Sequence, residues 1–420
     1  MMGPVSTQQT TGAPTSSAAF CPLHDAGACP SCPHMDLPLT DQLERKQARV
    51  AGLLADGANP VRASVWEPPQ PSTPERFRNK AKMAVSGTVN APVLGLADAR
   101  GLSVDLRRCP LHVPAVEAAL PVLTRLITEL RLTPYDIAAD RGELKHVLVT
   151  ASPDGELMVR LVCRTADRVP DLRAALPRLR EELPGLAVMS VNVQPVHQAV
   201  IEGPEEIVLA DASLGLGDRL LMRLSLPETE HRPARELPLL LPTRSFFQTN
   251  TAVAEALYAT AAEWSHDLTG TGGTASRPAE VWDLFCGVGG FGLALADQGR
   301  QVRGVEVSAP AIDGAREAAR LMGLRPGEVD FAAGDARVLD PAAGAVRDLL
   351  VVNPPRRGIG ADLAGRIEAS GTPRVLYSSC NPVSLAKDLA RIPSLRVRRA
   401  RLFDMFPHTN HAEVLVELAR

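Results

Sequence analysis

The sequence predicts an α/β protein whose C-terminal part is a Rossmann-like domain with a mixed, mostly parallel sheet, preceded by a central α+β domain. The first observation is an apolar strand, residues 281–285, that runs into the glycine-rich turn 286–292 and then into an apolar helix, 293–297. This order is typical of the first unit of a doubly wound fold. The second observation is a series of later apolar runs of strand length, namely residues 301–307, 329–332, 347–352 and 375–378.

Polar or reactive side chains follow the ends of the later strands; they are Glu306, Asp335, Asn353 and Cys380. In open α/β sheets, ligands bind beyond the carboxyl ends of the strands. Glu306 lies about 20 residues past the glycine turn, where an acid can bind ribose hydroxyls. The four residues therefore predict a ligand site at one edge of the sheet.

Cys380 lies between a strand and a helix. Asn381 can cap the helix expected at residues 383–390, and Pro382 suits its first position. The start of a helix lowers the pKa of a thiol, so we expect a reactive cysteine. A small buried residue is the ordinary explanation of an arbitrary cysteine, but the position shared with the other strand ends favours a functional one.

The composition predicts a soluble globular protein of two or three domains, with 420 residues, 45% hydrophobic and 22% charged. No run approaches the roughly 18 apolar residues of a membrane helix. The first 20 residues lack the basic and apolar regions of a secretory signal. We therefore expect a cytoplasmic monomer without a membrane partner. The net charge of −3 argues against a surface coated in positive charge, but it allows a local basic groove.

Four segments are expected along the chain. Residues 1–20, rich in Ser, Thr, Gly and Ala, predict a disordered tail. Residues 21–111 hold a cysteine cluster and a basic motif, residues 112–231 form the central α+β domain, and residues 232–420 form the Rossmann-like domain.

Within these segments, finer features are also expected. Residues 145–150 and 155–164 predict a hairpin around the turn Pro153-Asp154-Gly155. Cys163 lies in an apolar run and should belong to the core. The stretch TGTGGTAS, residues 269–276, predicts a flexible loop.

Four of the seven cysteines are each followed directly by proline: Cys21, Cys29, Cys32 and Cys109. Thiolates in stiff loops suit a four-cysteine metal site. Structural zinc usually shows two close cysteine pairs, and here only Cys29 and Cys32 form one, although His24 and His34 leave zinc open. Three clustered cysteines with a distant fourth favour an iron–sulfur cluster.

A basic motif, residues 76–82, carries four positive charges and one aromatic residue. Such a stretch could hold phosphates and stack a base. A solvated charged strand explains it equally well.

The step Asn353-Pro354-Pro355 separates two classes of cofactor enzyme. Nicotinamide enzymes have no use for it, whereas S-adenosylmethionine-dependent methyltransferases often carry N/D-P-P there. From Cys21 to the end, the chain then resembles the RNA uridine C5-methyltransferases. The motifs that carry the resemblance, with the four cysteines, are SFFQTN (245–250), DLFCGVGGFG (283–292), NPPRRGIG (353–360), YSSCN (377–381), DMFPHTNHAE (404–413) and FRNKAKM (77–83).

The resemblance also indicates a branch of the family. Some members carry an extra N-terminal β-barrel for RNA binding, which we do not expect here. The short form with a cysteine cluster looks like the branch that methylates large-subunit (23S) ribosomal RNA, and the tRNA branch lacks the cluster. His408 stands where many relatives have Gln, and we expect it to alter contacts to the base.

The resemblance assigns Gln248, Phe285, Glu306 and Asn353 to S-adenosylmethionine, while topology places Asp335 to meet the adenine. It also implies a [4Fe-4S] cluster on the four cysteines.

Uracil C5 is a weak nucleophile, and a thiolate that adds at C6 activates it. The resemblance makes Cys380 this thiolate and Glu413 the base that removes the C5 proton. Without the resemblance, Glu413 is an exposed acid that opens a strand at residues 414–418.

The expected substrate is ribosomal RNA whose target base is unpaired or flipped out. The central domain would dock the RNA, and the basic motif, Arg356, Arg357 and the run 396–401 could line its path, although each is more often a solvated face. Two alternatives remain: a tRNA uridine C5-methyltransferase, and a non-catalytic iron–sulfur protein that binds RNA or senses redox state.

Overall fold

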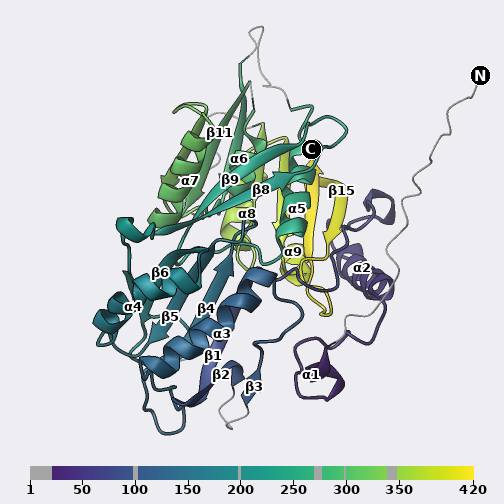
Figure 1. Cartoon of the computed structure of the whole chain (residues 1–420). Coiled ribbons are helices and arrows are strands. Elements are labelled where there is room, and N and C mark those ends of the chain that lie inside the picture. Colours follow the sequence, from purple (N-terminus) through teal and green to yellow (C-terminus); the bar gives the residue numbers. More distant parts are fainter. Residues whose placement is uncertain (1–20, 98–102, 197–199, 269–276, 298, 338–347) are drawn as a thin grey trace, which may run out of the picture.

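The computed structural model describes residues 21–97, 103–196, 200–268, 277–297, 299–337 and 348–420. These residues form two seven-stranded sheets and a two-stranded ribbon (Figure 1). The tail predicted at residues 1–20 and the loop predicted at 269–276 lie outside the described residues. Among the helices that are described, none is both long and apolar enough to cross a membrane.

The first sheet has the strand order β3-β2-β1-β4-β5-β6-β7, and its neighbours are antiparallel except β5 and β6. Its strands are β1 (Lys80–Thr88), β2 (Ala91–Ala97), β3 (Ser103–Asp105), β4 (Leu144–Ala151), β5 (Leu157–Cys163), β6 (Leu186–Val193) and β7 (Glu205–Val208). Helices α3 (Pro114–Glu129) and α4 (Val169–Glu182) pack on one face around a shared apolar core. The predicted hairpin is confirmed as β4 and β5, and Cys163 is fully buried, as expected.

Two predicted domain boundaries are wrong. The boundary after residue 111 cuts the first sheet, because β1 pairs with β4 across it. The boundary after residue 231 falls between β8 (Arg219–Leu226) and β9 (Arg235–Pro242), which pair along their whole length as the ribbon. Both errors arise because antiparallel pairing joins segments that composition alone separates.

The second sheet has the order β12-β11-β10-β13-β14-β16-β15. Its strands are β10 (Ala279–Leu284), β11 (Arg300–Glu306), β12 (Val329–Ala333), β13 (Leu349–Val352), β14 (Arg374–Ser379), β15 (Arg396–Phe403) and β16 (Glu413–Ala419). The strands β10 to β14 run parallel, and β16 is antiparallel to both of its neighbours. The predicted mixed, mostly parallel sheet is therefore confirmed.

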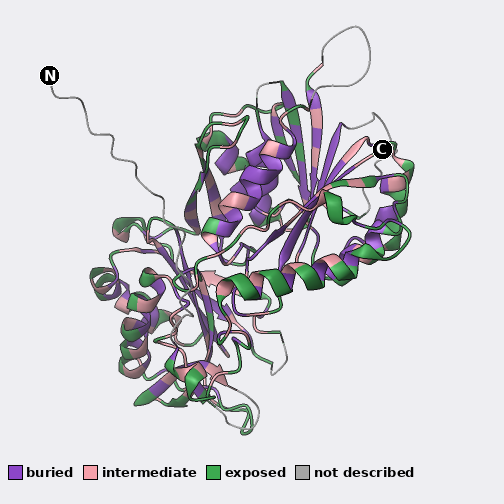
Figure 2. Cartoon of the chain, turned by 90° about the vertical axis from the view of Figure 1, so that its right-hand side faces the viewer, coloured by how far each residue is buried: buried purple, intermediate pink, exposed green. Residues whose placement is uncertain are grey.

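Helices cover both faces of the second sheet because successive strand residues point to opposite sides. Val351 faces α5 (Thr251–Trp264), α6 (Gly290–Leu295) and α7 (Ala309–Leu321). Val352 faces α8 (Gly360–Ala369), α9 (Pro382–Leu389) and the N-terminal helix α2 (Leu39–Ala55). Figure 2 shows the buried residues on the strands between these layers.

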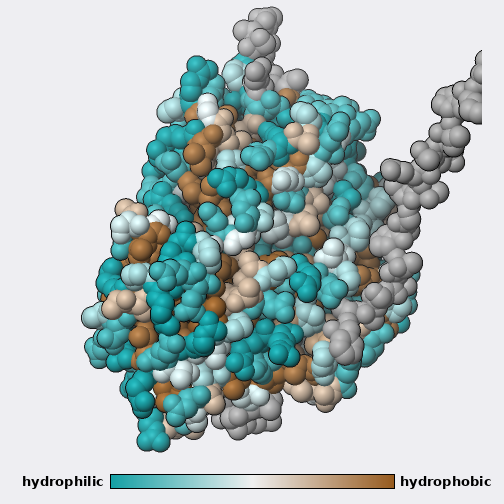
Figure 3. Space-filling view, viewed as in Figure 1, coloured by the Kyte–Doolittle hydropathy of each residue, from teal (hydrophilic) through white to brown (hydrophobic). Residues whose placement is uncertain are grey.

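The remaining short elements are α1 (Pro22–Asp25), η1 (Ala63–Val65) and η2 (Ala212–Leu214). The ribbon of β8 and β9 packs on α5 and α7, and β8 also touches β5 and β6, so the ribbon lies between the two sheets. On the face seen in Figure 3, hydrophilic side chains predominate and the apolar surface is divided into separate areas, as is usual for globular proteins.

Candidate active site

Three of the predicted ligand residues lie at one edge of the second sheet. Glu306 is the last residue of β11, Asn353 follows β13, and Cys380 follows β14. Because these strands are parallel, their carboxyl ends lie together. The parallel topology therefore brings the ends of these strands to one edge of the sheet, as the sequence predicts.

The glycine turn after β10 adjoins Glu306. Phe285 takes a φ of 63°, which is rare for a residue with a side chain. The backbone N–H of Gly287 donates to Glu306 Oε2 over 3.4 Å, and that of Ser308 donates to Oε1 over 3.1 Å. The carboxylate of Glu306 is therefore fixed beside the turn.

Two glycines of this turn have different surroundings. At Gly287, whose φ is 55°, a Cβ atom would meet nothing within 4 Å. At Gly290, a Cβ would lie 2.5 Å from the hydroxyl of Tyr258. Gly290 is thus required for packing, whereas Gly287 borders open space on the side where a ligand could approach the backbone.

The loop after β13 is fastened to the turn that holds Cys380. The carbonyl oxygen of Arg356 accepts hydrogen bonds from Asn381 Nδ2 at 2.9 Å and from Ser384 Oγ at 3.1 Å. Asn381 Oδ1 also caps α9 by accepting from the backbone N–H of Val383, as predicted. The backbone of Arg356 is consequently held beside the turn of Cys380, and its guanidinium lies near enough to lower the pKa of the Cys380 thiol.

The thiol of Cys380 is half-buried. Burial raises its pKa above the ordinary value, and the negative charge of Glu413 raises it further, whereas Arg356 and a backbone hydrogen bond lower it. The net direction is upward, because desolvation and the nearby carboxylate outweigh the lowering influences on this pKa.

Glu413 is buried at the start of β16, so the alternative of an exposed acid is wrong. Ser378, fully buried on the neighbouring β14, donates from Oγ to Glu413 Oε1 at 2.5 Å. Burial raises the pKa of Glu413 to about 7, while the bond from Ser378 lowers it. Ser378 had no predicted role, because only the pairing of β14 with β16 shows that its hydroxyl reaches Glu413.

Gln248 is buried just before α5. Its carbonyl oxygen accepts a hydrogen bond from Asn79 Nδ2 at 3.0 Å, and Asn79 Nδ2 also donates to Thr251 Oγ1 at 2.9 Å. The SFFQTN and FRNKAKM motifs are thus tied together.

Asp335 lies after β12 at the far side of the edge. Hydrogen bonds from the side chain and backbone of Arg337 lower the pKa of Asp335 to about 2. Its carboxylate therefore binds Arg337, through Nη2 at 2.7 Å, in the structure.

The segment that leads to Glu413 is clamped by helix α2. Lys46 Nζ, almost fully buried, donates to Asp404 Oδ1 at 2.5 Å and to the Phe406 carbonyl at 3.0 Å. Gln42 Oε1 accepts from the backbone N–H of His408 at 2.8 Å. Both partners of the ion pair are buried, so loss of either one would leave an unpaired charge away from water.

His408 is itself fully buried. Its Nε2 donates to the Pro74 carbonyl at 2.7 Å, and its carbonyl accepts from the backbone N–H of His34 at 3.1 Å. In the structure the ring holds the N-terminal segment to the segment before Glu413, and an effect of His408 on contacts to the base stays a prediction.

The four cysteines followed by proline, namely Cys21, Cys29, Cys32 and Cys109, line one cavity of about 110 Å³. Burial, together with the other three thiols, raises the pKa of Cys32 to about 12. Within the part of the chain that the structure describes, no three of these sulfurs lie within 4.8 Å of one another. The four thiols thus line one shared space.

The basic motif has a mixed structural role. Phe77 is buried against Cys21, Cys32 and Leu111, so the expectation that this aromatic stacks a base is wrong. Arg78 is exposed beside the cysteine cavity. Arg76 and Lys82 are exposed as well, whereas burial lowers the pKa of Lys80 to about 8.

Two other parts of the predicted path differ in exposure. Arg356 and Arg357 are exposed near Cys380. In the run 396–401, Arg399 pairs with Glu417, and Arg401 donates to Pro68, Gln70 and Thr260. The arginines of β15 are thus largely engaged within the molecule.

Comparison with known proteins gives concordant results. A family model described as tRNA (uracil-5-)-methyltransferase matches residues 345–420. Curated relatives named 23S rRNA (uracil(747)-C(5))-methyltransferase RlmC are 43% identical over 401 residues in Pectobacterium atrosepticum and 44% identical over 401 residues in Edwardsiella ictaluri. Each alignment covers 95% of this chain and 99% of the relative.

A solved structure shares the fold. The Pyrococcus abyssi tRNA (uracil-54, C5)-methyltransferase, crystallised with S-adenosyl-L-homocysteine, superposes with a TM-score of 0.70 at 23% identity. The match covers 93% of this chain and 86% of that chain.

Proposed function

Because this chain belongs to the family of 23S rRNA (uracil-C5)-methyltransferases, we propose that it methylates C5 of a uridine in large-subunit ribosomal RNA through a covalent adduct with Cys380. The observation that carries the mechanism is the buried Glu413, held by Ser378 on the strand that leads to Cys380. A thiol and an acid are the two groups that this chemistry needs from the protein.

The target uridine is inferred from the relatives. Their names specify uracil 747 of 23S rRNA, and the alignments span nearly the whole of each chain. We assign the equivalent uridine to this protein. The family model with the tRNA name matches only the C-terminal part, residues 345–420. This match therefore supports the reaction, uracil C5 methylation, and does not identify the RNA substrate.

S-adenosylmethionine supplies the methyl group that the reaction transfers to C5. The open space beside Gly287 and the fixed carboxylate of Glu306 support its binding at the strand ends. Glu306 would hold the ribose hydroxyls, and Gln248, Phe285 and Asn353 would complete the site.

Asp335 stays a weaker candidate for the adenine, because its carboxylate binds Arg337.

Cys380 begins the chemistry. Its raised pKa means that the free enzyme holds a protonated thiol, so the thiol proton must pass to solvent water as the uracil is bound. The exposed Arg356 lowers the pKa and would stabilise the thiolate. The sulfur then forms a bond to C6 of the uracil, and the electron pair of the C5–C6 bond moves to C5 and the C4 carbonyl.

Glu413 completes the chemistry. After C5 has gained the methyl group, it still carries its hydrogen, and a base must remove that hydrogen as a proton. Glu413 has a pKa of about 7, so a large fraction is ionised near neutral pH. When Glu413 takes the proton, the C5–C6 double bond reforms and the sulfur of Cys380 leaves as thiolate.

The four-cysteine cavity supports a [4Fe-4S] cluster better than zinc. A tetrahedral zinc ion, with bonds of about 2.3 Å, would need its sulfurs about 3.8 Å apart. Among the described residues, no three of the sulfurs in this cavity lie within 4.8 Å of one another. Cys21, Cys29, Cys32 and Cys109 would ligate the cluster, which would hold the N-terminal segment to the loop at Cys109.

The exposed residues Arg76, Arg78, Lys82, Arg356 and Arg357 are our candidates for phosphate contacts. They lie on the basic motif and on the loop beside Cys380.

The function is tested by mapping 5-methyluridine in total RNA from cells with and without the gene. We expect a single 23S rRNA uridine to lose its methyl group and to regain it when the wild-type chain, but not Cys380→Ala, is returned. Loss of 5-methyluridine from tRNA instead would assign the chain to the other substrate, and unchanged RNA would contradict enzymatic function.

A further inference from the structure

Asp388 is a buried carboxylate close to the candidate active site, and the mechanism described above gives it no task. It lies in the last turn of α9, the helix that begins directly after Cys380, and only 1% of its surface is exposed. Its Oδ1 accepts from Arg391 Nη1 at 3.1 Å. A buried carboxylate is costly unless its oxygens have hydrogen-bond partners, so the partners of Oδ2 show what this residue holds together.

The second oxygen of Asp388 joins two segments of the site. Oδ2 accepts from the backbone N–H of Ile359 at 2.9 Å and from Tyr377 Oη at 2.8 Å. Ile359 belongs to the loop that follows Asn353, whereas Tyr377 lies in β14, three residues before Cys380. Burial raises the pKa of Tyr377, and the carboxylate of Asp388 raises it further, so the hydroxyl keeps its proton and donates.

The loop passes this carboxylate at close range. Gly358 has a φ of 82°, and a Cβ atom there would lie 2.2 Å from Asp388 Oδ2. The backbone N–H of Gly358 also donates to the carbonyl of Pro355 at 2.8 Å, which closes a turn. Glycine is therefore needed for the loop to come this near to Asp388.

The loop is thus fastened to α9 at two points, with Arg356 at the first. The carbonyl of Arg356 is held by residues at the start of α9, and the backbone of Ile359 is held by Asp388 near its end. The charged groups that act on the Cys380 thiol are Arg356, which lowers its pKa, and Glu413, which raises it. A displacement of the loop would therefore change the balance of charge at the thiol.

We propose that Asp388 is a positioning residue for the methylation reaction: by fastening the loop after β13 to β14, it keeps the guanidinium of Arg356 beside the Cys380 thiol. The proposal rests on the proposed function, because a reaction that starts from a thiolate needs a cation at this place. Asp388 is itself buried and would act through Arg356.

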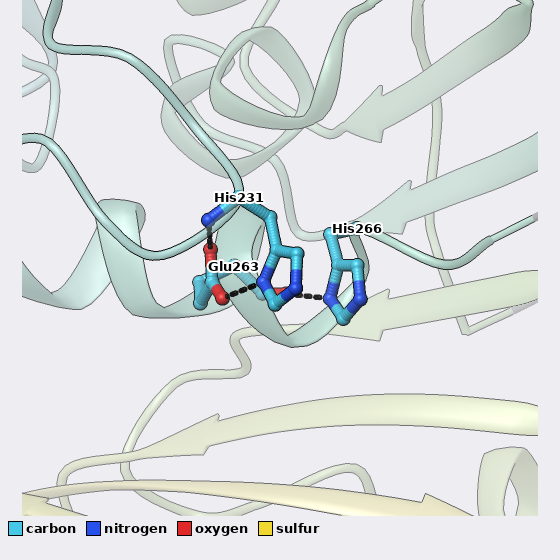
Figure 4. Close-up of side chains that lie close together, drawn as sticks. All are labelled: His231, Glu263 and His266. Carbon is cyan, nitrogen blue, oxygen red and sulfur yellow. Dashed lines mark hydrogen bonds and ion pairs between the residues drawn. The ribbon is translucent and has the colours of Figure 1, made fainter.

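A second carboxylate, Glu263, provides a matched control. It accepts from the backbone N–H of His231 at 3.2 Å and thereby fastens a neighbouring segment to the end of α5. Figure 4 shows Glu263 beside His231, whose ring stacks on His266. The carbonyl of the residue after Glu263 accepts from Arg374, the first residue of β14. This cluster is therefore near the amino end of the strand whose carboxyl end leads to Cys380.

The test is the rate at which iodoacetamide alkylates Cys380 in the full-length protein without RNA. The rate is followed against pH by mass spectrometry of the peptide that contains Cys380. Only the thiolate reacts, so the midpoint reports the pKa of the thiol. Asp388→Ala should raise the midpoint and slow alkylation near neutral pH by about 3–10-fold, as should Arg356→Ala. Glu263→Ala should leave the midpoint unchanged.

Two further variants separate positioning from a general loss of structure. In Asp388→Asn the amide oxygen can still accept both hydrogen bonds, so this variant should keep the midpoint of the wild type. If Asp388 acts through Arg356, the double variant Asp388→Ala/Arg356→Ala should match Arg356→Ala alone, whereas independent effects would add.

Tyr377→Phe gives the same information if Asp388→Ala fails to fold, because it removes one donor and keeps the ring in the core. It should raise the midpoint when Arg356 is present and leave it unchanged in the Arg356→Ala background. An unshifted midpoint in Tyr377→Phe or in folded Asp388→Ala would overturn the proposal, as would an additive shift in the double variant or an equal shift in Glu263→Ala. Failure of the proposed function would show separately, as a wild-type chain that is alkylated normally but methylates no rRNA.

Discussion

Cysteines occur in two contrasting surroundings in this protein. In the cavity lined by Cys21, Cys29, Cys32 and Cys109, burial and the neighbouring thiols both raise the pKa of Cys32, to about 12. Cys380 stands without another thiol beside it among the described residues and has Arg356 and Glu413 as its charged neighbours. Four thiols in such surroundings would ionise together only around a cation, whereas one thiol beside a cation and an acid is suited to react with a substrate.

The largest expected effect is a loss of methylation that distinguishes Cys380 from the four cysteines of the cavity. Cys380→Ala should reduce methylation on the order of 10⁴-fold or more, because the nucleophile is lost. Iron content should stay unchanged. Cys163→Ala is the matched control, because Cys163 is a buried core residue with no role in either site. It should keep both the methylation activity and the iron content. Methyl transfer to rRNA and iron per chain are the measurements, and loss of iron in Cys380→Ala would break the comparison.

The second prediction concerns the acid beside Cys380. Glu413→Gln should still allow attack by sulfur and methyl transfer, but the C5 proton can no longer be taken. Methylated RNA should then stay joined to Cys380 through C6. A shifted protein band carrying labelled methyl groups should survive denaturing electrophoresis. It should vanish in Cys380→Ala/Glu413→Gln, and normal turnover by Glu413→Gln would show that another base acts.

The third prediction tests the four-cysteine cavity. Protein purified without oxygen should be brown, with about four iron and four sulfide per chain. Cys32→Ala should lose most of this iron, since one of four ligands is gone, while Cys163→Ala keeps it. Stoichiometric zinc without sulfide in the wild type would refute the cluster.

The smallest expected effect is a shift in pH dependence. Glu413 acts as a base only when ionised, so the proton-removal rate should rise with pH through about 7. The bond from Ser378 lowers the pKa of Glu413, so Ser378→Ala should raise it by about one unit and slow the reaction at neutral pH. Ser378→Thr keeps the hydroxyl and is the control. Single-turnover rates between pH 6 and about 9 measure the midpoint, and an unshifted midpoint would deny Ser378 this role.

The sequence predicts the second sheet well because its signals are local. Each strand, turn and helix occupies a few consecutive residues, and parallel topology then brings Glu306, Asn353 and Cys380 to one edge. Ser378 illustrates the limit. Its hydroxyl meets an acid 35 residues away, and only the antiparallel pairing of β14 with β16 shows this.

Burial accounts for the other differences. Phe77 looks like a stacking residue within a basic stretch, but it packs against the cysteines. The helix start at Cys380 suggests an acidic thiol, yet desolvation and Glu413 decide the direction of its pKa. In both cases the outcome depends on what surrounds the side chain in three dimensions, which neighbours in the sequence do not reveal.

The clamp of helix α2 on the segment before Glu413 also constrains how the protein is made. Lys46 and Asp404 are separated by 358 residues, and His34 and Asn410, which are 2.8 Å apart, by 376. Because translation begins at the N-terminus, α2 emerges from the ribosome long before its partner exists. The segment before Glu413 must be synthesised and released before the contacts of this clamp can form. Nascent chains therefore lack the assembled site, and methylation can begin only once the whole polypeptide has been finished.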